Sequence, residues 1–287
     1  MNDSSTSRLA RDPEANSPLR VDRDRIYRET PERTLAMDVY RASDGESRPA
    51  VVLLHGGGWR EGNKGQLSRY ALDLAAAGYV TVEPSYRLSH EATFPAALED
   101  VKAAVRHVRS NAAELGVDPG RVGAFGHSAG AHLAVLAGAT GDRSVLGSEP
   151  AAAYEETARL DAVVGVSGVY DLTREPSTDG TESSSEMAVA FLGGHYEEVP
   201  ERYAAASVHA HVDAGGDGDC PPTLFSHGTA DDVVGAGQSE RCHEALAVAG
   251  VDTDLHLADG GDHVFLHSSA WYPETFPRYR EFFDSRV

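Results

Sequence analysis

Apolar and polar positions along the chain predict a regular alternation of strands and helices from about residue 25 to the C-terminus. Val51–Leu54 form a short, continuous apolar run that ends in glycines, which is typical of a strand buried on both faces. Between Ala96 and Leu115, apolar side chains return every three or four residues and indicate an amphipathic helix, which Pro95 opens and Gly116 ends. This β–α–β order predicts an α/β fold with a mostly parallel sheet of about eight strands and helices on both faces.

The remaining elements follow the same order. The segments around 24–30 and 34–42, separated by Thr30–Arg33, predict an N-terminal hairpin. Further strands are expected in 79–88, 121–127, 160–172, 222–228 and 252–260, and helices in 64–77, 128–139, 238–249 and 273–286.

The chain reads as a polar tail followed by one domain. Residues 1–22 have the composition of a solvated tail, and 23–287 hold the strand–helix pattern. Residues 173–211 interrupt that pattern with a stretch rich in Ser, Thr, Glu and Gly, which includes one helical patch. An insertion after a strand often covers an active site, so we expect a small cap there; a surface excursion without a role is the alternative.

The overall composition indicates a globular protein and argues against some classes of partner. Apolar residues make up 41% of the 287, as in a globular protein, and neither a transmembrane run nor a signal peptide is seen. Cys220 and Cys242 set no disulfide framework, which favours free thiols and a cytoplasmic protein, with a single bridge left open. The net charge of −20 makes nucleic acid and anionic membranes poor partners.

The basic residues are unusual, because Lys64 and Lys102 are the only lysines and the others are arginines. An acidic, solvated surface is expected of a protein from a halophile, since molar salt screens its charge repulsion. A GC-rich genome that replaces lysine by arginine, together with ordinary acidity, is the alternative.

A candidate nucleophile lies in Gly126–Gly130, which fits the G-x-S-x-G pattern with Ser128 at its centre. The pattern alone is weak, and Ser128 as the N-cap of an ordinary turn is the competing interpretation. Its context is specific, because an apolar strand precedes it and an apolar helix follows it, as a nucleophile elbow requires. The helix N-terminus would then face any anion that develops at the serine.

A glycine-rich loop, His55–Trp59, follows the apolar run and has the character of an oxyanion hole. The expected donors are the backbone N–H groups of Gly57, Gly58 and Ala129. A phosphate-binding loop is the rival, but the three consecutive glycines fit neither the P-loop nor the dinucleotide spacing. We expect His55 to hold the loop.

A serine nucleophile needs a base, and 13 histidines are available. The order Ser…Asp…His expected of this architecture selects Asp231 as the acid and His263 as the base, each just after a predicted strand. Asp231 is preferred to Asp232 because it completes an H-G-x-x-D pattern. Asp262 is expected to be a solvated loop acid.

The other histidines are given structural or surface positions. His127 is expected to support the elbow, and His132 to be structural. His256 is expected to be packed or exposed within its strand, and His267 to face away if Val264–Ser268 is helical. His195, His209 and His211 fall in the candidate cap without the spacing of a structural zinc site, so neither a metal nor a cofactor is expected.

Together these motifs resemble the α/β-hydrolase superfamily and, within it, the hormone-sensitive-lipase-like esterases with an HGGG loop. The likeness is closest to the feruloyl/acetyl-esterase-like carboxylesterases of microbes, and it extends from about Arg20 to the C-terminus. It implies an α/β-hydrolase fold and a Ser128–Asp231–His263 triad that forms an acyl-enzyme. Ala131, His90, Ser85 and the segment Ser207–Val212 depart from the usual family residues, which concerns substrate preference and leaves the triad intact.

The resemblance implies a serine carboxylesterase that acts on small short-chain acyl or aryl esters. An arylformamidase or other amidase with the same triad is the alternative, and a non-catalytic binding module on this fold is a third. Trp59, Tyr86, Phe191 and Trp271 are candidates to line a pocket, although core or surface packing would explain each equally well. The protein is expected to be a monomer or a homodimer.

Overall fold

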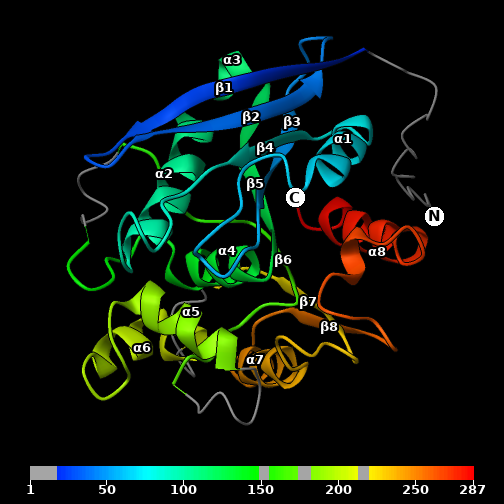
Figure 1. The fold of residues 1–287 in the computed structure, drawn as a ribbon. Coiled ribbons are helices and arrows are strands. Elements are labelled where there is room, and N and C mark those ends of the chain that lie inside the picture. Colours follow the sequence, from blue (N-terminus) through cyan, green and yellow to red (C-terminus); the bar gives the residue numbers. More distant parts are fainter. Residues whose placement is uncertain (1–17, 149–154, 174–181, 213–219) are drawn as a thin grey trace, which may run out of the picture.

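One eight-stranded sheet forms the centre of the computed structural model, which describes residues 18–148, 155–173, 182–212 and 220–287 (Figure 1). The strand order in these residues is β1-β2-β4-β3-β5-β6-β7-β8. β1 pairs with β2, and β2 with β4, in antiparallel fashion, whereas every other neighbouring pair is parallel. The predicted α/β class and mostly parallel sheet are confirmed.

The strands span Leu19–Glu29 (β1), Thr34–Ala42 (β2), Arg48–Leu54 (β3), Val80–Pro84 (β4), Val117–His127 (β5), Val163–Val166 (β6), Thr223–Gly228 (β7) and Thr253–Ala258 (β8). The helices span Ser68–Ala76 (α1), Ala96–Ser110 (α2), Ala112–Leu115 (α3), Ala129–Thr140 (α4), Glu182–Leu192 (α5), Pro200–Ala206 (α6), Gly237–Val248 (α7) and Tyr272–Asp284 (α8). Two short 3₁₀ turns cover Val208–His211 (η3) and Phe265–His267 (η4).

Each face of the sheet carries its own apolar core. In β3, Val52 and Leu54 belong to the core that α2, α4 and α7 cover, whereas Val51 and Leu53 belong to the core under α1 and α8. All of these side chains are at most 1% exposed, which explains why the strand reads as a continuous apolar run. Burial on both faces thus holds the strand ends, and the loops that follow them, in place.

Several predicted boundaries are wrong. The strands expected in 79–88 and 160–172 are shorter, as β4 and β6, and the helix expected in 64–77 begins only at Ser68. β1 already begins at Leu19, inside the range 1–22 assigned to the tail, because residues 19–22 pair with β2; residues 1–17 lie outside the described part. The helix expected over Ala96–Leu115 is broken at Asn111, whose side-chain amide donates to the carbonyl of His107 at 2.8 Å. The backbone N–H of Asn111 donates to the same carbonyl at 3.1 Å, and the residue has φ of −108° and ψ of 19°, outside the usual helical values. Gly116, with φ of 69°, ends the second piece as expected.

The carboxyl ends of β3, β5, β7 and β8 point the same way, because these strands are parallel to one another through the sheet. Loops that leave these ends are therefore brought to one edge, where ligand sites of such sheets form. In the described ranges, no helix is both long and apolar enough to cross a membrane.

Candidate active site

Ser128 stands at a sharp turn between β5 and α4. Its φ of 53° and ψ of −118° lie outside the regions that side-chain-bearing residues usually occupy. The turn is held by its backbone N–H, which donates to the carbonyl of Val166 on β6 at 2.8 Å. This turn places the hydroxyl of Ser128 above the sheet, at the N-terminus of α4. The arrangement has the geometry of a nucleophile elbow.

The glycines of the elbow are required by close packing. A Cβ at Gly130 would overlap the carbonyl oxygens of Leu54 and His55, and a Cβ at Gly126 would overlap the backbone of Gly130. Both positions therefore let β5, α4 and the β3 loop approach within backbone contact. Ala131, which departs from the usual family glycine, is fully buried without conflict.

A continuous line of hydrogen bonds joins the three residues that the sequence selected. Nε2 of His263 lies 3.0 Å from Oγ of Ser128, and Nδ1 of His263 lies 2.8 Å from Oδ2 of Asp231. A carboxylate only accepts, so Nδ1 carries the proton and Nε2 is left to accept from the serine hydroxyl. The tautomer that a general base needs is thus set by Asp231.

Asp231 is itself tightly held. Its side chain is fully buried and its Oδ1 accepts the backbone N–H groups of Val233 and Val234, at 2.9 and 2.8 Å. Burial on its own raises the pKa of Asp231, but the hydrogen bonds from His227 and His263 outweigh it and hold that pKa well below its usual range. The carboxylate therefore stays ionised next to the imidazole.

His227 supports this acid and was not singled out in the sequence. Its Nε2–H is shared between Oδ2 of Asp231 (3.1 Å) and the carbonyl of Val234 (2.9 Å), and its Nδ1 lies 2.7 Å from the hydroxyl of Ser239. The imidazole is completely buried. The H-G-x-x-D pattern could have identified this residue, because His227 is its histidine and stands four residues before the acid.

The glycine loop presents free backbone donors beside Ser128. Gly57 and Gly58 have φ of 117° and 57°, which turn their N–H groups away from regular bonding. Within the described residues, the N–H groups of Gly57, Gly58 and Ala129 donate no hydrogen bond, and all three residues line the same cavity as Ser128. Such unpaired donors around a nucleophile have the chemistry of an oxyanion hole.

Side chains beneath the glycine loop hold it in position. His55 holds its own loop, with Nδ1 2.8 Å from the carbonyl of Gly56 and its ring stacked on Tyr86 at 4.2 Å. Tyr86 donates its hydroxyl to the carbonyl of His55 at 2.8 Å, and Gln66 accepts the N–H of Gly56 at 2.7 Å. Burial lowers the pKa of His55 to about 4, so the ring is neutral and unsuited to act as a cation.

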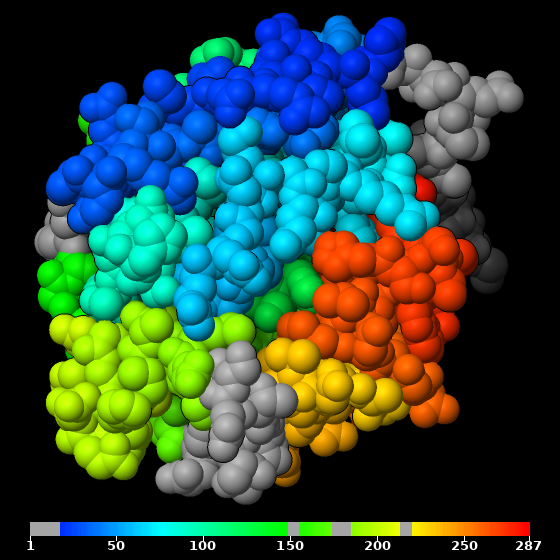
Figure 2. Space-filling model, viewed as in Figure 1, coloured from blue at the N-terminus to red at the C-terminus, as the bar shows by residue number. Residues whose placement is uncertain are grey.

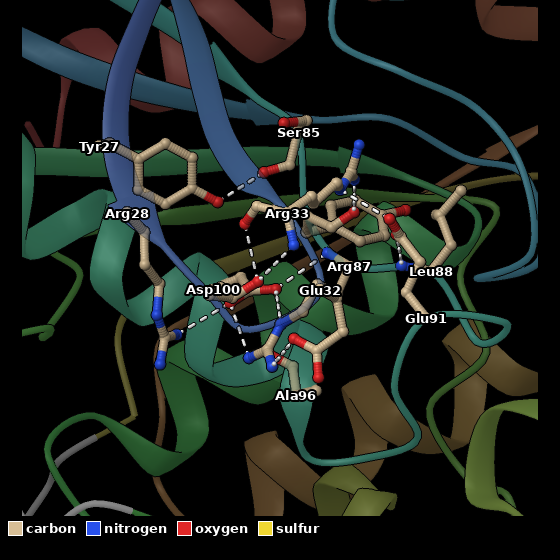
Figure 3. A network of polar contacts seen from close by, with 12 residues as sticks. Tyr27, Arg28, Glu32, Arg33, Ser85, Arg87, Leu88, Glu91, Ala96 and Asp100 are labelled. Atoms are coloured by element: carbon tan, nitrogen blue, oxygen red, sulfur yellow. Dashed lines mark hydrogen bonds and ion pairs between the residues drawn. The ribbon is translucent and has the colours of Figure 1, made fainter.

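A buried ion network holds the Tyr86 segment in turn (Figure 3). Asp100 of α2 is fully buried and accepts from Arg28 of β1 and from both the backbone and the guanidinium of Arg87, each at 2.9 Å. Arg33, from the turn of the hairpin, donates to the carbonyl of Tyr86 at 2.7 Å. The N-terminal hairpin is thus connected to the glycine loop through Arg33, Tyr86 and His55.

A cavity of about 610 Å³ opens over Ser128. Figure 2 shows this face hollowed where the cyan, orange and yellow-green segments meet, with green atoms recessed between them. The β3 loop, the elbow, the loop after β8 and the segment 185–203 all contribute to its wall. Residues 182–211 of the candidate cap hold α5, α6 and η3, and residues 174–181 of that candidate lie outside the described part.

The four aromatic candidates have different positions. Trp59 lines the cavity and stacks on Phe191 of α5 at 4.5 Å, so Phe191 supports the wall from behind. Tyr86 is fully buried beneath the glycine loop, and Trp271 packs edge-on against Phe265 at 6.0 Å. Only the first of the four faces the candidate site among the described lining residues.

His127 supports the elbow as expected, whereas the expectation for His267 is wrong. Nε2 of His127 lies 3.0 Å from the carbonyl of His263, and burial lowers the pKa of His127 to about 3. His267 lies in the 3₁₀ turn η4, yet it lines the cavity and meets the ring of His127 edge-on at 5.2 Å. The position of η4 against the elbow thus directs His267 towards the cavity.

The other histidines and acids considered in the sequence take no part in the hydrogen bonds that join Ser128, His263 and Asp231. His132 bridges Trp59 and the carbonyl of Ala206, and His256 lies between Ser226 and Glu274. Asp232 is exposed, and Asp262 accepts the N–H of Val264. Among the histidines of the candidate cap, His195 lines the cavity, whereas His209 lies 3.9 Å from Asp171 and His211 lies 2.7 Å from the carbonyl of Ala205.

The described residues hold neither a metal-binding cluster nor a disulfide. No group of three or more His, Cys, Asp or Glu among residues 18–148, 155–173, 182–212 and 220–287 is arranged to hold a metal ion. Cys220 and Cys242 are both free thiols, as expected, and burial raises the pKa of Cys220 to about 12.

Comparison with known proteins identifies the family of this chain. The BD-FAE family model matches residues 37–246. The esterase LipQ of Mycobacterium tuberculosis is 32% identical over 226 residues, which cover 76% of this chain and 51% of LipQ. The chain therefore spans about half the length of this curated relative.

Two solved structures are similar over nearly the whole chain. A truncated carbohydrate esterase from gut microbiota superposes with a TM-score of 0.79 at 26% identity, covering 95% of this chain and 98% of that one. The esterase Est2 of Thermogutta terrifontis, with butyrate bound, has a TM-score of 0.75 at 28% identity, covering 93% and 94%. With its fold, its elbow and the matching family model, this chain belongs to the BD-FAE family, a hormone-sensitive-lipase-like group of α/β-hydrolases.

Proposed function

We propose that the chain is a serine carboxylesterase that hydrolyses small short-chain acyl or aryl esters, with Ser128, His263 and Asp231 as its triad. The observation that carries the proposal is the unbroken hydrogen-bonded line from Ser128 through His263 to Asp231 at the floor of a cavity. A binding module would have no need of an ionised, buried acid aligned with an imidazole and a strained serine.

Acylation follows from this geometry. Nε2 of His263 takes the hydroxyl proton of Ser128 as Oγ attacks the acyl carbon, and the ionised Asp231 stabilises the resulting imidazolium. The carbonyl oxygen becomes an oxyanion that the N–H groups of Gly57, Gly58 and Ala129 stabilise; one such donor is typically worth about 10²–10³ in kcat. His263 then gives its proton to the leaving alcohol.

Deacylation repeats these steps with water. His263 deprotonates a water molecule that attacks the acyl-enzyme, and the second oxyanion occupies the same donors. Collapse of this intermediate releases the acid and returns the proton to Ser128. Apart from water and the ester, every group in this cycle is a side chain or backbone N–H of the chain.

The size of the cavity supports a small substrate. Its volume of about 610 Å³ lies in the range of sites for small molecules, and its wall mixes apolar side chains such as Trp59, Val169 and Leu172 with polar ones. The Thermogutta terrifontis esterase has been solved with butyrate and with propionate bound, and phosphonylated by sarin. Short acyl groups are therefore the first substrates to test.

A panel of nitrophenyl esters from acetate to long-chain acids, run in low and in molar salt, tests the proposal. We expect the highest kcat/KM on short chains, and Ser128→Ala should lower kcat by roughly 10⁴–10⁶. A fluorophosphonate probe should label the wild type and leave Ser128→Ala unlabelled. Near-wild-type hydrolysis by Ser128→Ala would remove Ser128 from the mechanism.

A matched formanilide in the same panel distinguishes the esterase from an arylformamidase. Both reactions use the same triad, but an amine leaving group depends more strongly on proton delivery by His263. A kcat/KM for the formanilide that exceeds that of the corresponding ester would favour the amidase.

A further inference from the structure

Met187 reaches from the cap helix α5 onto the glycine loop. A Cβ added to Gly58 would overlap Sδ of Met187 and lie 3.1 Å from its Cγ. Met187 is partly buried and lines the cavity together with Gly58 and Ser128. Its thioether is therefore in contact with Gly58, whose N–H is a proposed oxyanion donor. Small solutes can reach the thioether through the cavity.

The helix that carries Met187 has little freedom to withdraw. One turn further along α5, Phe191 stacks on Trp59 and its carbonyl accepts the N–H of Phe94 at 2.8 Å. At the end of the helix, the carbonyl of Leu192 accepts from Arg202 at 2.8 Å. A larger or more polar side chain at 187 would consequently act on the Gly58 loop instead of pushing α5 away.

Of the sulfur-bearing residues in the described part of the chain, only Met187 lines the cavity. Met37 is completely buried in β2, and Cys242 is 5% exposed. Burial raises the pKa of Cys220 to about 12, which leaves almost none of the reactive thiolate at neutral pH. A small oxidant that enters the cavity would meet the thioether of Met187 first.

We propose that Met187 is an oxidation site through which peroxide lowers the activity of the enzyme. The sulfur loses two electrons to hydrogen peroxide, the O–O bond breaks, one oxygen atom forms the sulfoxide and the other leaves as water. The modification can be reversed by a methionine sulfoxide reductase. The effect on hydrolysis, but not the modification itself, rests on the proposed esterase function.

The consequence follows from the contact with Gly58. Oxidation turns a flexible apolar side chain into a polar and bulkier one. With the oxyanion loop on one side and the anchored α5 on the other, the added oxygen must either displace the loop or project into the cavity. The first outcome moves the Gly58 N–H, on which stabilisation of the oxyanion depends, and the second takes space beside Ser128 that the substrate needs.

The experiment treats the full chain with graded hydrogen peroxide and follows two readouts. Peptide mapping by mass spectrometry measures sulfoxide at Met187 and Met37, and hydrolysis of nitrophenyl butyrate measures kcat/KM. Wild type, Met187→Leu and Met37→Leu are each compared with their own untreated activity. Met187→Gln, a polar side chain of similar length, mimics the sulfoxide without oxidant.

Sulfoxide should accumulate at Met187 before Met37, with activity falling in proportion by about tenfold or more. Met187→Leu should keep most of its own activity under the same treatment, Met37→Leu should behave like wild type, and reductase should restore wild-type activity. The proposal is overturned if Met187 resists oxidation, if its sulfoxide leaves kcat/KM unchanged, or if Met187→Leu is inactivated equally. An untreated wild type without esterase activity would instead refute the proposed function.

Discussion

The indole N–H of Trp59 donates a hydrogen bond to Nδ1 of His132, 3.2 Å away, and so joins the glycine loop to the nucleophile helix. The other ring nitrogen of His132 lies 2.8 Å from the carbonyl of Ala206 at the end of α6. One buried imidazole thus connects the oxyanion loop, α4 and the candidate cap. Burial lowers the pKa of His132 to about 4, which keeps the ring neutral and able to accept from the indole.

Trp59→Phe tests this connection. The ring that stacks on Phe191 is retained, but Nδ1 of His132 loses its donor inside the core, which should cost about 1–3 kcal/mol of unfolding free energy. Because the loop is less well held, kcat should fall by roughly tenfold with a smaller change in KM. Urea denaturation and steady-state kinetics measure the two effects. Unchanged kcat with reduced stability would limit the bond to a structural role.

His227 should act as a positioning residue for Asp231. Replacing it by Phe removes a hydrogen bond to a charged group, a loss of about 1.5–3 kcal/mol that corresponds to roughly 10–100-fold in kcat if it falls on the transition state. Steady-state kinetics measures this loss. His256→Phe, a similar change one strand away, is the matched control and should leave kcat unchanged.

Asp100→Ala should destabilise the fold strongly. The substitution leaves Arg28 and Arg87 without their buried partner, and removal of one member of a buried ion pair typically costs about 3–5 kcal/mol. Asp252→Ala removes an exposed partner of Arg286 and should change the unfolding free energy by less than about 1 kcal/mol. Equal effects of the two variants in chemical denaturation would contradict the importance of the Figure 3 network.

Acid should destabilise the protein before its carboxylates titrate. Burial lowers the pKa of His55 and His132 to about 4, and that of His127 to about 3, from 6.5. The unfolded chain therefore binds protons at these positions below pH 6.5 while the folded chain does not, so the unfolding free energy falls as pH falls from about 6.5 towards 4. Each histidine contributes up to about 1.4 kcal/mol per pH unit.

Denaturation curves at several pH values in this window measure the slope. His132→Asn should reduce it by the share of one histidine, even though the variant is less stable at every pH. A slope that is the same in wild type and His132→Asn would show that this imidazole is not protonated on unfolding.

Salt should stabilise the protein if the acidic composition is a halophilic adaptation. With a net charge of −20, repulsion between carboxylates opposes folding at low ionic strength, and molar salt reduces its range to about 3 Å. We expect the melting temperature to rise from low to molar KCl. Full stability in dilute buffer would instead favour the alternative of a GC-rich genome.

The sequence was sufficient for the parts of the molecule that depend on local pattern. The apolar run of β3 and the Gly116 stop follow from strand burial and from backbone conformations that few residues adopt. The order of Ser128, Asp231 and His263 after their strands could be read in the same way, because parallel strands deliver their carboxyl ends to one edge. The break at Asn111 could not be predicted in this way, because it lies in the backbone conformation of one residue within a regular helical pattern.

What the sequence by itself determined was the fold, the elbow and the three residues that lie along one line of hydrogen bonds. Only the tertiary structure decided which distant side chains meet at this edge. His267 beside His127 and Met187 against Gly58 are brought together across long chain separations. His227 lies four residues before Asp231, but only the folded structure shows the hydrogen bond between them. Local periodicity carries no information about such contacts, because they depend on how separate elements pack over the sheet edge.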